Sequence, residues 1–311
     1  MMQSATLSII CPYHSSLPGY KSSSVVFRGW YCRRSDRIRL RRFFCNECRR
    51  GFSEATLTFE YRQRKRTIND LLFRLLASNN SMRRSAVLAC VARRTVERRL
   101  LYFSKVASRY HQKFIERLEP VRSIHFDDME TSEHTKMKPL SIPIAVEHPT
   151  RLILSFDVVS MPPKGPLAKK SRKKYGPRRD DRLSGWNRVL NSVAKICVAD
   201  AAITTDSHIR YPEVIRSHMP FATHIQVKGR RGCVAGQGEL KDGGWDPLFS
   251  LNHTAAMLRA NICGLIRRTW CTTKKKDRLF QHIMIYVMWH NESILARQQK
   301  RNKCFPFPRA A

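Results

Sequence analysis

The sequence predicts an α/β domain that follows a small cysteine-rich β unit and an all-helical unit. Cysteine, arginine and aromatic residues dominate residues 1–57, and arginine and leucine recur with a helical period over 65–118. From about residue 121 onward, strand-like and helical segments alternate, which is typical of an α/β domain. A chain of 311 residues is long enough for two or three such units.

Composition points to an anionic partner. The chain has 58 Lys and Arg against 24 Asp and Glu, a formal net charge of +34 and a pI near 10.6. This charge favours nucleic acid, with an anionic membrane surface as the alternative. Hydrophobic residues make up 42% of the chain, which is enough for real cores. The apolar stretch 282–289 is far shorter than the roughly 18 residues that a membrane span requires.

The first residues predict an intracellular, cytoplasmic protein. MMQSATLSIICPYH lacks the basic region of a signal peptide and leads directly into a cysteine motif. Without a secretory signal, ten cysteines favour metal binding in a reducing compartment over disulfides.

The first unit, residues 8–57, is predicted to be a zinc ribbon. Two paired motifs supply four candidate ligands: Cys11 and His14 in CPYH, and Cys45 and Cys48 in CNEC. This set fits tetrahedral zinc, and Cys32 is an alternative ligand. The stretches SSVVFRGWY and RIRLRRFF between the motifs predict β-hairpins. Zinc in so small a unit is expected to be structural, because the metal substitutes for a missing core.

The second unit, residues 65–118, is predicted to contain three helices. TINDLLFRLLASN has its apolar residues at helical spacing, SMRRSAVLACV offers a short helix, and ARRTVERRLLYFSKVA places Val96, Leu100 and Phe103 on one face. This order is that of a helix-turn-helix, whose last helix enters the major groove of DNA. The alternative is an amphipathic helix with a solvated basic face. The candidate DNA contacts are Arg93, Arg94, Arg98 and Arg99, with Arg94 and Arg98 foremost.

The third unit, residues 121–295, carries the α/β pattern and precedes a basic tail at 296–311. Strand-like segments include LSIPIAV, RLILSFDVV, AAITTD and HIQV, and helices are expected near 185–199, 211–219, 247–268 and 278–291. Trp186, Val189, Leu190 and Val193 are expected to pack on the sheet. The basic segment 161–185 and the glycine-rich segment 228–246 are predicted to be loops.

Carboxylates gather at the ends of two predicted strands in this unit. SIHF leads into Asp127, and AAIT leads into TTDSH with Asp206. Carboxylates on adjacent strands can hold two divalent metal ions, which stabilise the attacking and leaving oxygens of a phosphoryl displacement. Magnesium suits this chemistry, because it binds carboxylates and phosphate oxygens.

The order of motifs resembles that of bacterial insertion-sequence transposases over roughly residues 8–295. A CP-x-H/C-x2-C ribbon and a helix-turn-helix precede FDDMET, TTDSH, LNHTAAMLR and IRRTWCTTKK. The resemblance implies a DDE catalytic domain of ribonuclease-H-like fold, a mixed sheet with flanking helices. It assigns the first two acidic positions to Asp127, with Asp128 as the alternative, and to Asp206. The third falls on Asn252, with Arg259 seven residues later as a phosphate contact.

Asn252 departs from the family pattern, because an amide brings a metal ligand without negative charge and cannot act as a base. Asp246 is the alternative third ligand. The resemblance implies a transposase that binds the terminal inverted repeats of its element and cuts and joins double-stranded DNA with Mg²⁺ or Mn²⁺. It also implies a homo-oligomer, with a dimer expected, and neither a membrane nor a small-molecule substrate. The alternatives are a DNA-binding protein without catalysis and a nuclease that cleaves without joining.

Overall fold

The computed structural model describes residues 9–13, 24–58, 60–228, 246–266 and 270–299. The chain divides between Leu72 and Phe73 into two compact units. The first contains a three-stranded antiparallel sheet, and the second contains a six-stranded mixed sheet with helices on both faces. These features confirm the predicted mixed α/β domain and the separate small β unit before it. None of the helices described here combines the length and the apolar composition that crossing a bilayer requires.

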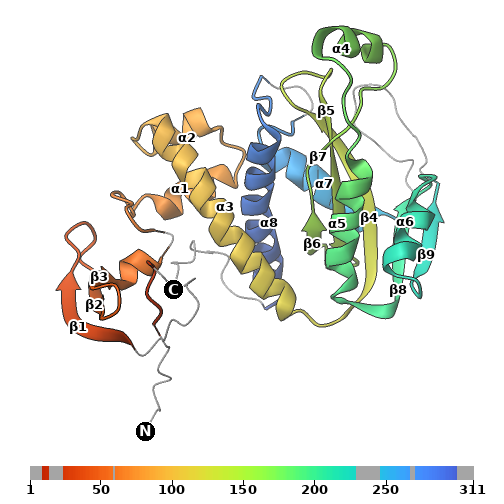
Figure 1. Cartoon of the computed structure of the whole chain (residues 1–311). Helices are drawn as coiled ribbons and strands as arrows, with labels where there is room; N and C mark the ends of the chain where they lie inside the picture. Colours follow the sequence, from red (N-terminus) through yellow and green to blue (C-terminus); the bar gives the residue numbers. More distant parts are fainter. Residues whose placement is uncertain (1–8, 14–23, 59, 229–245, 267–269, 300–311) are drawn as a thin grey trace. The chain divides into compact units, whose positions relative to one another are not determined.

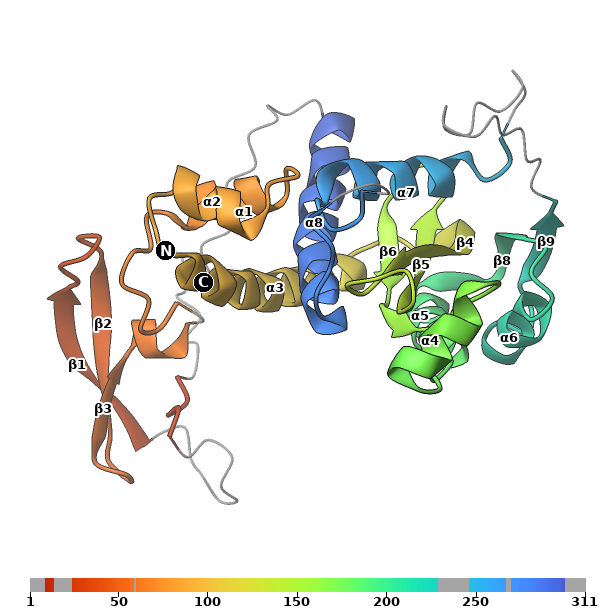
Figure 2. The same cartoon turned by 90° about the horizontal axis from the view of Figure 1, so that it is seen from above.

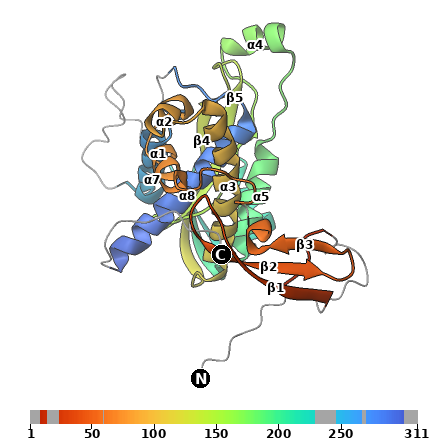
Figure 3. The same ribbon diagram turned by 90° about the vertical axis from the view of Figure 1, so that its left-hand side faces the viewer.

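The N-terminal sheet has the order β1-β2-β3 (Figure 3). Its strands are β1 (Val25–Cys32), β2 (Arg39–Cys45) and β3 (Arg50–Ser53), and a 3-10 helix, η2 (Glu54–Leu57), follows them. Its small core consists of Phe43 and Phe52 together with Cys11 and Cys45. A core of this size contributes little stability, and a metal held by the cysteines at its centre would add to it.

Three helices occupy the region predicted to be a helix-turn-helix: α1 (Asn69–Leu76), α2 (Met82–Leu88) and α3 (Arg93–Glu116). The hydroxyl of Ser81 accepts a hydrogen bond from the backbone of Arg84 at 3.2 Å and so begins α2. The predicted inner face of α3, with Val96, Leu100 and Phe103, is buried. The helical part of the prediction is therefore confirmed.

The large sheet has the order β6-β5-β4-β8-β9, with the short β7 beside β5 (Figure 1). Its strands are β4 (Val121–Ser132), β5 (Pro139–Glu147), β6 (Ile153–Phe156), β7 (Val159–Ser160), β8 (Cys197–Asp206) and β9 (Thr223–Val227). The strand β5 pairs antiparallel with β4, β6 and β7, whereas β8 runs parallel to both β4 and β9. The central strands β4 and β8 therefore carry their C-terminal ends to the same side of the sheet.

Helices cover both faces of this sheet (Figure 2). One face packs against α5 (Arg182–Ala194) and α6 (Tyr211–His218), and the other against α7 (Phe249–Asn261) and α8 (Lys276–Gln298). The predicted packing face of α5 is confirmed, because its four apolar members are each at most 1% exposed: Trp186, Val189, Leu190 and Val193. The helix predicted over 247–268 ends at Asn261, because Ile262 adopts an extended backbone.

The segment 161–185 is not the loop that its Pro, Lys and Arg content predicts. It contains the helix α4 (Leu167–Tyr175), which lies by the turn between β4 and β5 (Figure 1). Long unbranched Lys and Arg side chains favour helix, and Gly176 ends it with a φ of 76°. The hydroxyl of Ser171 donates to the carbonyl of Met137 at 2.7 Å and so fixes α4 to the turn. Of the predicted loop 228–246, residues 229–245 lie outside the described residues, as do residues 300–311 of the predicted tail.

Candidate functional site

Asp127 and Asp206 are neighbours on the two central strands. The parallel register pairs Phe126 of β4 with Thr205 of β8, so the next residue on each strand is an aspartate. Buried β-branched side chains hold β8 in the sheet up to this point, and Asp206 ends the strand. The structure thus brings together the two carboxylates that the sequence placed about 80 positions apart.

The carboxyl group of Asp127 is strongly perturbed. Its burial, followed by the negative charge of Asp206, raises its pKa to about 7. The backbone N–H of Asp128 and the hydroxyl of Tyr211 donate to its Oδ1 at 2.6 and 3.2 Å, and both lower the pKa in part. A cation bound between the two carboxylates would relieve this repulsion, so the pair has the electrostatics of a divalent-metal site.

Asp128 points to the opposite face of β4. Its two carboxylate oxygens each accept from Trp186 Nε1 at 2.9 Å. Burial raises its pKa to about 6, against the lowering effect of the bond from Trp186. The carboxylate of Asp128 is thus taken up by a buried indole, whereas that of Asp127 faces Asp206 and could hold a cation with it.

An aromatic cluster lies behind the two aspartates. Three rings form this cluster, with centroids 4.8 to 5.2 Å apart: Trp186 of α5, His208 just before α6, and Tyr211 at the start of α6. Burial and the charges of Asp128 and Asp127 raise the pKa of Tyr211, so its hydroxyl stays protonated and acts as a donor. The backbone N–H of His208 donates to Asp206 Oδ1 at 3.1 Å, which orients the second carboxylate.

The start of α7 holds both candidates for the third ligand. Asn252 Nδ2 donates to Asp246 Oδ2 at 2.9 Å. This bond fixes the orientation of the amide group, whose oxygen is the atom that could bind a metal. The helix α7 covers the face of β4 that carries Asp127. On this face His125 stacks on His148 at 4.6 Å, and His148 Nδ1 lies 3.0 Å from Ser250 Oγ of α7.

A metal site needs several ligand atoms close together. Among the described residues, one group of three or more His, Cys, Asp or Glu side chains has its ligand atoms within 4.8 Å of one another, and this group consists of cysteines. No described carboxylate or imidazole therefore joins Asp127 and Asp206 at that spacing. The structure brings two of the predicted acidic ligands together, and leaves Asp246 bonded to Asn252 instead.

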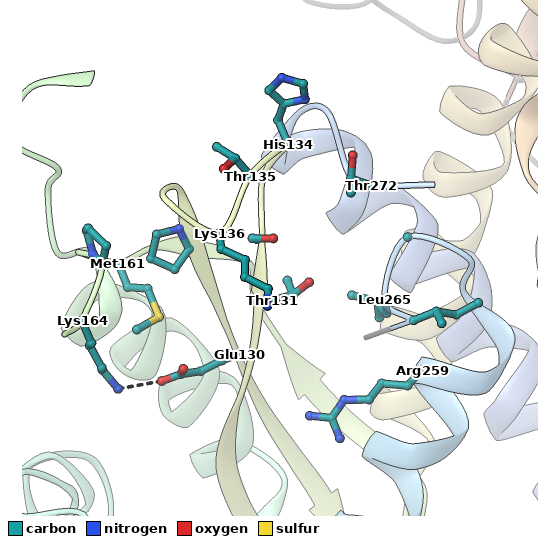
Figure 4. A pocket seen from close by; sticks show the side chains of 15 residues that line it. Glu130, Thr131, His134, Thr135, Lys136, Met161, Lys164, Arg259, Leu265 and Thr272 are labelled. Carbon is teal, nitrogen blue, oxygen red and sulfur yellow. Dashed lines mark hydrogen bonds and ion pairs between the residues drawn. The ribbon is translucent and has the colours of Figure 1, made fainter. Parts of the chain in front are cut away.

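Arg259 lies seven residues beyond Asn252 on α7 and lines a cavity of about 590 Å³ beside the end of β4 (Figure 4). Lys136, from the turn between β4 and β5, and Lys164 line the same cavity. Among the described residues of its lining, the one acidic side chain is that of Glu130, which pairs with Lys164 at 2.7 Å. The cavity is therefore cationic and suits an anion such as a phosphate group.

The cysteine group consists of Cys11, Cys45 and Cys48, and it can hold a metal such as zinc. The sulfur atoms of Cys11 and Cys48 lie 3.7 Å apart. Burial acts to raise the pKa of Cys45, but the backbone N–H groups of Cys48 and Glu47 and the hydroxyl of Ser24 lower it to about 7. A thiol that ionises so readily is a ready zinc ligand.

The fourth zinc ligand predicted from the sequence, His14, lies outside the described residues. The alternative, Cys32, is removed from the cysteine group. It pairs with Arg39 at one end of the β1–β2 ladder, whereas Cys45 pairs with Val25 at the other end. Cys32 is also exposed, so it is not a member of the site.

The four arginines predicted to contact DNA separate into two kinds. Arg93, Arg94 and Arg98 are exposed at the start of α3, and Arg93 pairs with Glu97 at 2.9 Å. Arg99 is only 6% exposed and lies on the inner side of the helix. The inclusion of Arg99 among the DNA contacts therefore does not agree with the structure, because its side chain packs inside the unit.

Comparison with protein-family models gave no match to this chain, and comparison with curated proteins gave none either. What the site can do is therefore argued from its own residues. Sequence reasoning had no access to three features of the site: the Tyr211 hydroxyl on Asp127, the indole on Asp128, and Lys136 beside Arg259. The one available signal was the tryptophan, whose N–H needs a polar partner when buried.

Proposed function

We propose that the chain is a transposase whose ribonuclease-H-like domain cuts and joins double-stranded DNA with divalent metal ions. The observation that supports this most strongly is the pair Asp127 and Asp206, which occupy neighbouring positions on adjacent parallel strands. Burial and the charge of Asp206 raise the pKa of Asp127 to about 7. Paired carboxylates perturbed in this way are typical of sites that bind a cation and act on phosphate esters.

The donor set fits magnesium. Asp127 and Asp206 would hold the ion, with the amide oxygen of Asn252 as a neutral third ligand, because its nitrogen is bonded to Asp246. When bound, the metal supplies positive charge to the oxygens of the phosphate that reacts. Tyr211 and the backbone of His208 keep the two carboxylates oriented throughout. Arg259 and Lys136 would bind and position phosphate groups in the cavity at the end of β4.

The reaction would proceed in two displacements at phosphorus. Water cleaves a phosphodiester at the end of the element, and the freed 3′-hydroxyl then attacks the target strand, with no covalent protein–DNA intermediate. The exposed arginines of α3 and the zinc-bound N-terminal unit would bind the terminal inverted repeats. Two ends must be held together, so the active form would be an oligomer.

One observation favours a second function. Asn252 stands where the family resemblance requires a carboxylate, and Asp246 is bonded to it instead of joining the two aspartates. A site with two carboxylates and one amide binds magnesium more weakly, so the chain would then be a sequence-specific DNA-binding protein without catalysis.

One experiment separates these functions. The full chain is incubated with Mg²⁺ and a labelled duplex carrying the inverted repeats that flank its gene, and cleavage and joining are measured beside binding. We expect both products with the wild type, and neither with Asp206→Asn, which should still bind. Asp200→Asn, at an exposed position on the same strand, is the matched control and should remain active. Binding by the wild type without either product would establish the second function, and cleavage without joining would indicate a nuclease.

A further inference from the structure

One face of the N-terminal sheet carries a groove built from rings and guanidinium groups. Strand alternation places Arg42 and Phe44 of β2 on this face, and Tyr31 of β1 lies beside them. The guanidinium of Arg42 lies 5.3 Å from the ring centroid of Tyr31, and that of Arg28 lies 5.1 Å from the ring of Phe44. Together with flanking residues they line a cavity of about 760 Å³. We name this cavity the aromatic groove.

The walls of the aromatic groove continue its chemistry. Tyr13 and Tyr61 also line it, and their side chains are 43% and 44% exposed. Each ring has a guanidinium over it, from Arg50 and from Arg62, at 5.3 Å. Among the described residues that line the groove, none is acidic. Its surface is thus cationic, aromatic and accessible.

The floor of the groove contains a gap at the third strand. Gly51 pairs with Phe44 and so belongs to the same face, but it has no side chain to fill the space. A Cβ atom at this position would meet only the backbone oxygen of Phe43, at 3.8 Å, an ordinary contact. A larger residue at 51 would therefore project into the groove without displacing the strand.

This combination suits unpaired nucleotides. Rings and planar guanidinium groups stack on the faces of bases, and arginines pair with the phosphates between them. In a duplex the base faces are covered by neighbouring base pairs, so only a single strand presents them. We propose that the aromatic groove binds single-stranded DNA by stacking its bases. This activity goes beyond the proposed transposase function, which requires only duplex binding, and does not depend on it.

The test uses the zinc-loaded full chain and a fluorescent oligothymidine of about 10 nucleotides, a length within the usual site sizes of such grooves. Anisotropy gives the affinity for this strand and for a duplex of equal length. Gly51→Val should weaken single-strand binding on the order of tenfold or more, since each lost stack is worth about 1–3 kcal/mol. Duplex binding should fall several-fold less than single-strand binding, because stacking of bases in the groove is not part of it.

A pair of variants on one strand provides the matched control. Arg42 and Arg39 are both exposed on β2, and each lies over a ring, Tyr31 in one case and Trp30 at 5.0 Å in the other. They point to opposite faces, so Arg42→Ala should weaken single-strand binding several-fold more than Arg39→Ala, at equal cost in charge. Equal losses in the two variants, or no single-strand binding by the wild type, would overturn the proposal. If Gly51→Val loses its zinc or its fold, the arginine pair alone decides.

Discussion

The indole Nε1 of Trp186 lies 2.9 Å from both carboxylate oxygens of Asp128 and donates to them. This bond ties α5 to β4 on the face of the sheet opposite to Asp127. Two adjacent aspartates of identical chemistry therefore have different tasks: one binds a buried N–H group, and the other faces Asp206.

The two aspartates should respond differently to the same substitution. Asp127→Asn should lower DNA cleavage on the order of 10²-fold or more, because it removes a metal ligand worth several kcal/mol in the transition state. Asp128→Asn retains an oxygen that accepts from Trp186, so cleavage should stay within about an order of magnitude of the wild type. Single-turnover cleavage rates measure both. Equal losses would contradict the assignment of Asp127.

The raised pKa of Asp127 predicts a pH-dependent stability. Its pKa is about 7 in the folded chain against an ordinary value of 3.8, so between these values the folded state holds a proton that the unfolded chain has released. Its contribution to the free energy of unfolding is therefore present below about pH 4 and is lost as the pH rises to about 7. Asp127→Asn lacks this loss. In urea unfolding without metal, the free energy of unfolding of the variant should rise relative to that of the wild type between pH 5 and pH 7.5.

Magnesium should reverse this effect at neutral pH. A cation that binds only the folded state raises the unfolding midpoint of the wild type, and the stabilisation grows with the logarithm of one plus the ratio of cation concentration to dissociation constant. The midpoint of Asp127→Asn should shift much less. A thermal melt with and without Mg²⁺ at pH 7.5 measures this without any reference to activity. Equal shifts in both proteins would place the metal elsewhere.

The cysteine group predicts a selective loss of structure. Cys45→Ser should remove the bound zinc and unfold the N-terminal sheet, because Cys45 also forms part of its small core. Cys32→Ser should keep the zinc, since Cys32 lies at the opposite end of the β1–β2 ladder. Atomic spectroscopy measures the zinc content of each variant, and limited proteolysis of the region before Phe73 measures whether the N-terminal sheet is folded. Full zinc content in the Cys45 variant would contradict the site.

Neighbouring arginines on α3 should separate DNA binding from stability. Arg98→Ala should weaken duplex binding and lower the slope of log affinity against log salt by about one, with little change in stability. Arg99→Ala removes a buried side chain and should lower the free energy of unfolding by about 1–3 kcal/mol. Salt titrations and denaturant unfolding of both variants measure these effects. The reverse pattern would contradict the exposed role of Arg98.

Gly185 should tolerate no side chain. A Cβ atom there would lie 2.8 Å from Val159 Cγ1 and 3.2 Å from Pro143 Cγ, so α5 must shift away from the sheet. Gly185→Ala should therefore lower the free energy of unfolding by about 1–3 kcal/mol, despite the higher helix propensity of alanine. Asn191→Ala, at an exposed position of the same helix, should be neutral or stabilising. Denaturant unfolding measures both.

Much of the local structure follows from the sequence alone. The helical period of leucines reflects which side of a helix meets the core, and this requirement is local. The strand β5 is buried on both faces, so LSIPIAV is identified as a strand by its β-branched residues and not by an inner and an outer side. The motifs CPYH and CNEC identified the three cysteines that lie together, because two ligands separated by two residues are brought close by the turn between them. The helix α4 escaped this reasoning, since its basic residues favour both a helix and a solvated loop.

Other properties depend on strand register and on what covers each face of the sheet, and these come from the tertiary fold. The pairing of Phe126 with Thr205 places Asp127 beside Asp206, and the packing of α5 assigns Asp128 to Trp186. The same kind of information distinguishes buried Arg99 from exposed Arg98. Local sequence patterns were enough to predict most of the elements, though not α4, and the chemical types of the candidate ligands, because these depend on neighbours along the chain. Their grouping into sites depends on contacts between strands and helices far apart in the chain, which no local pattern encodes.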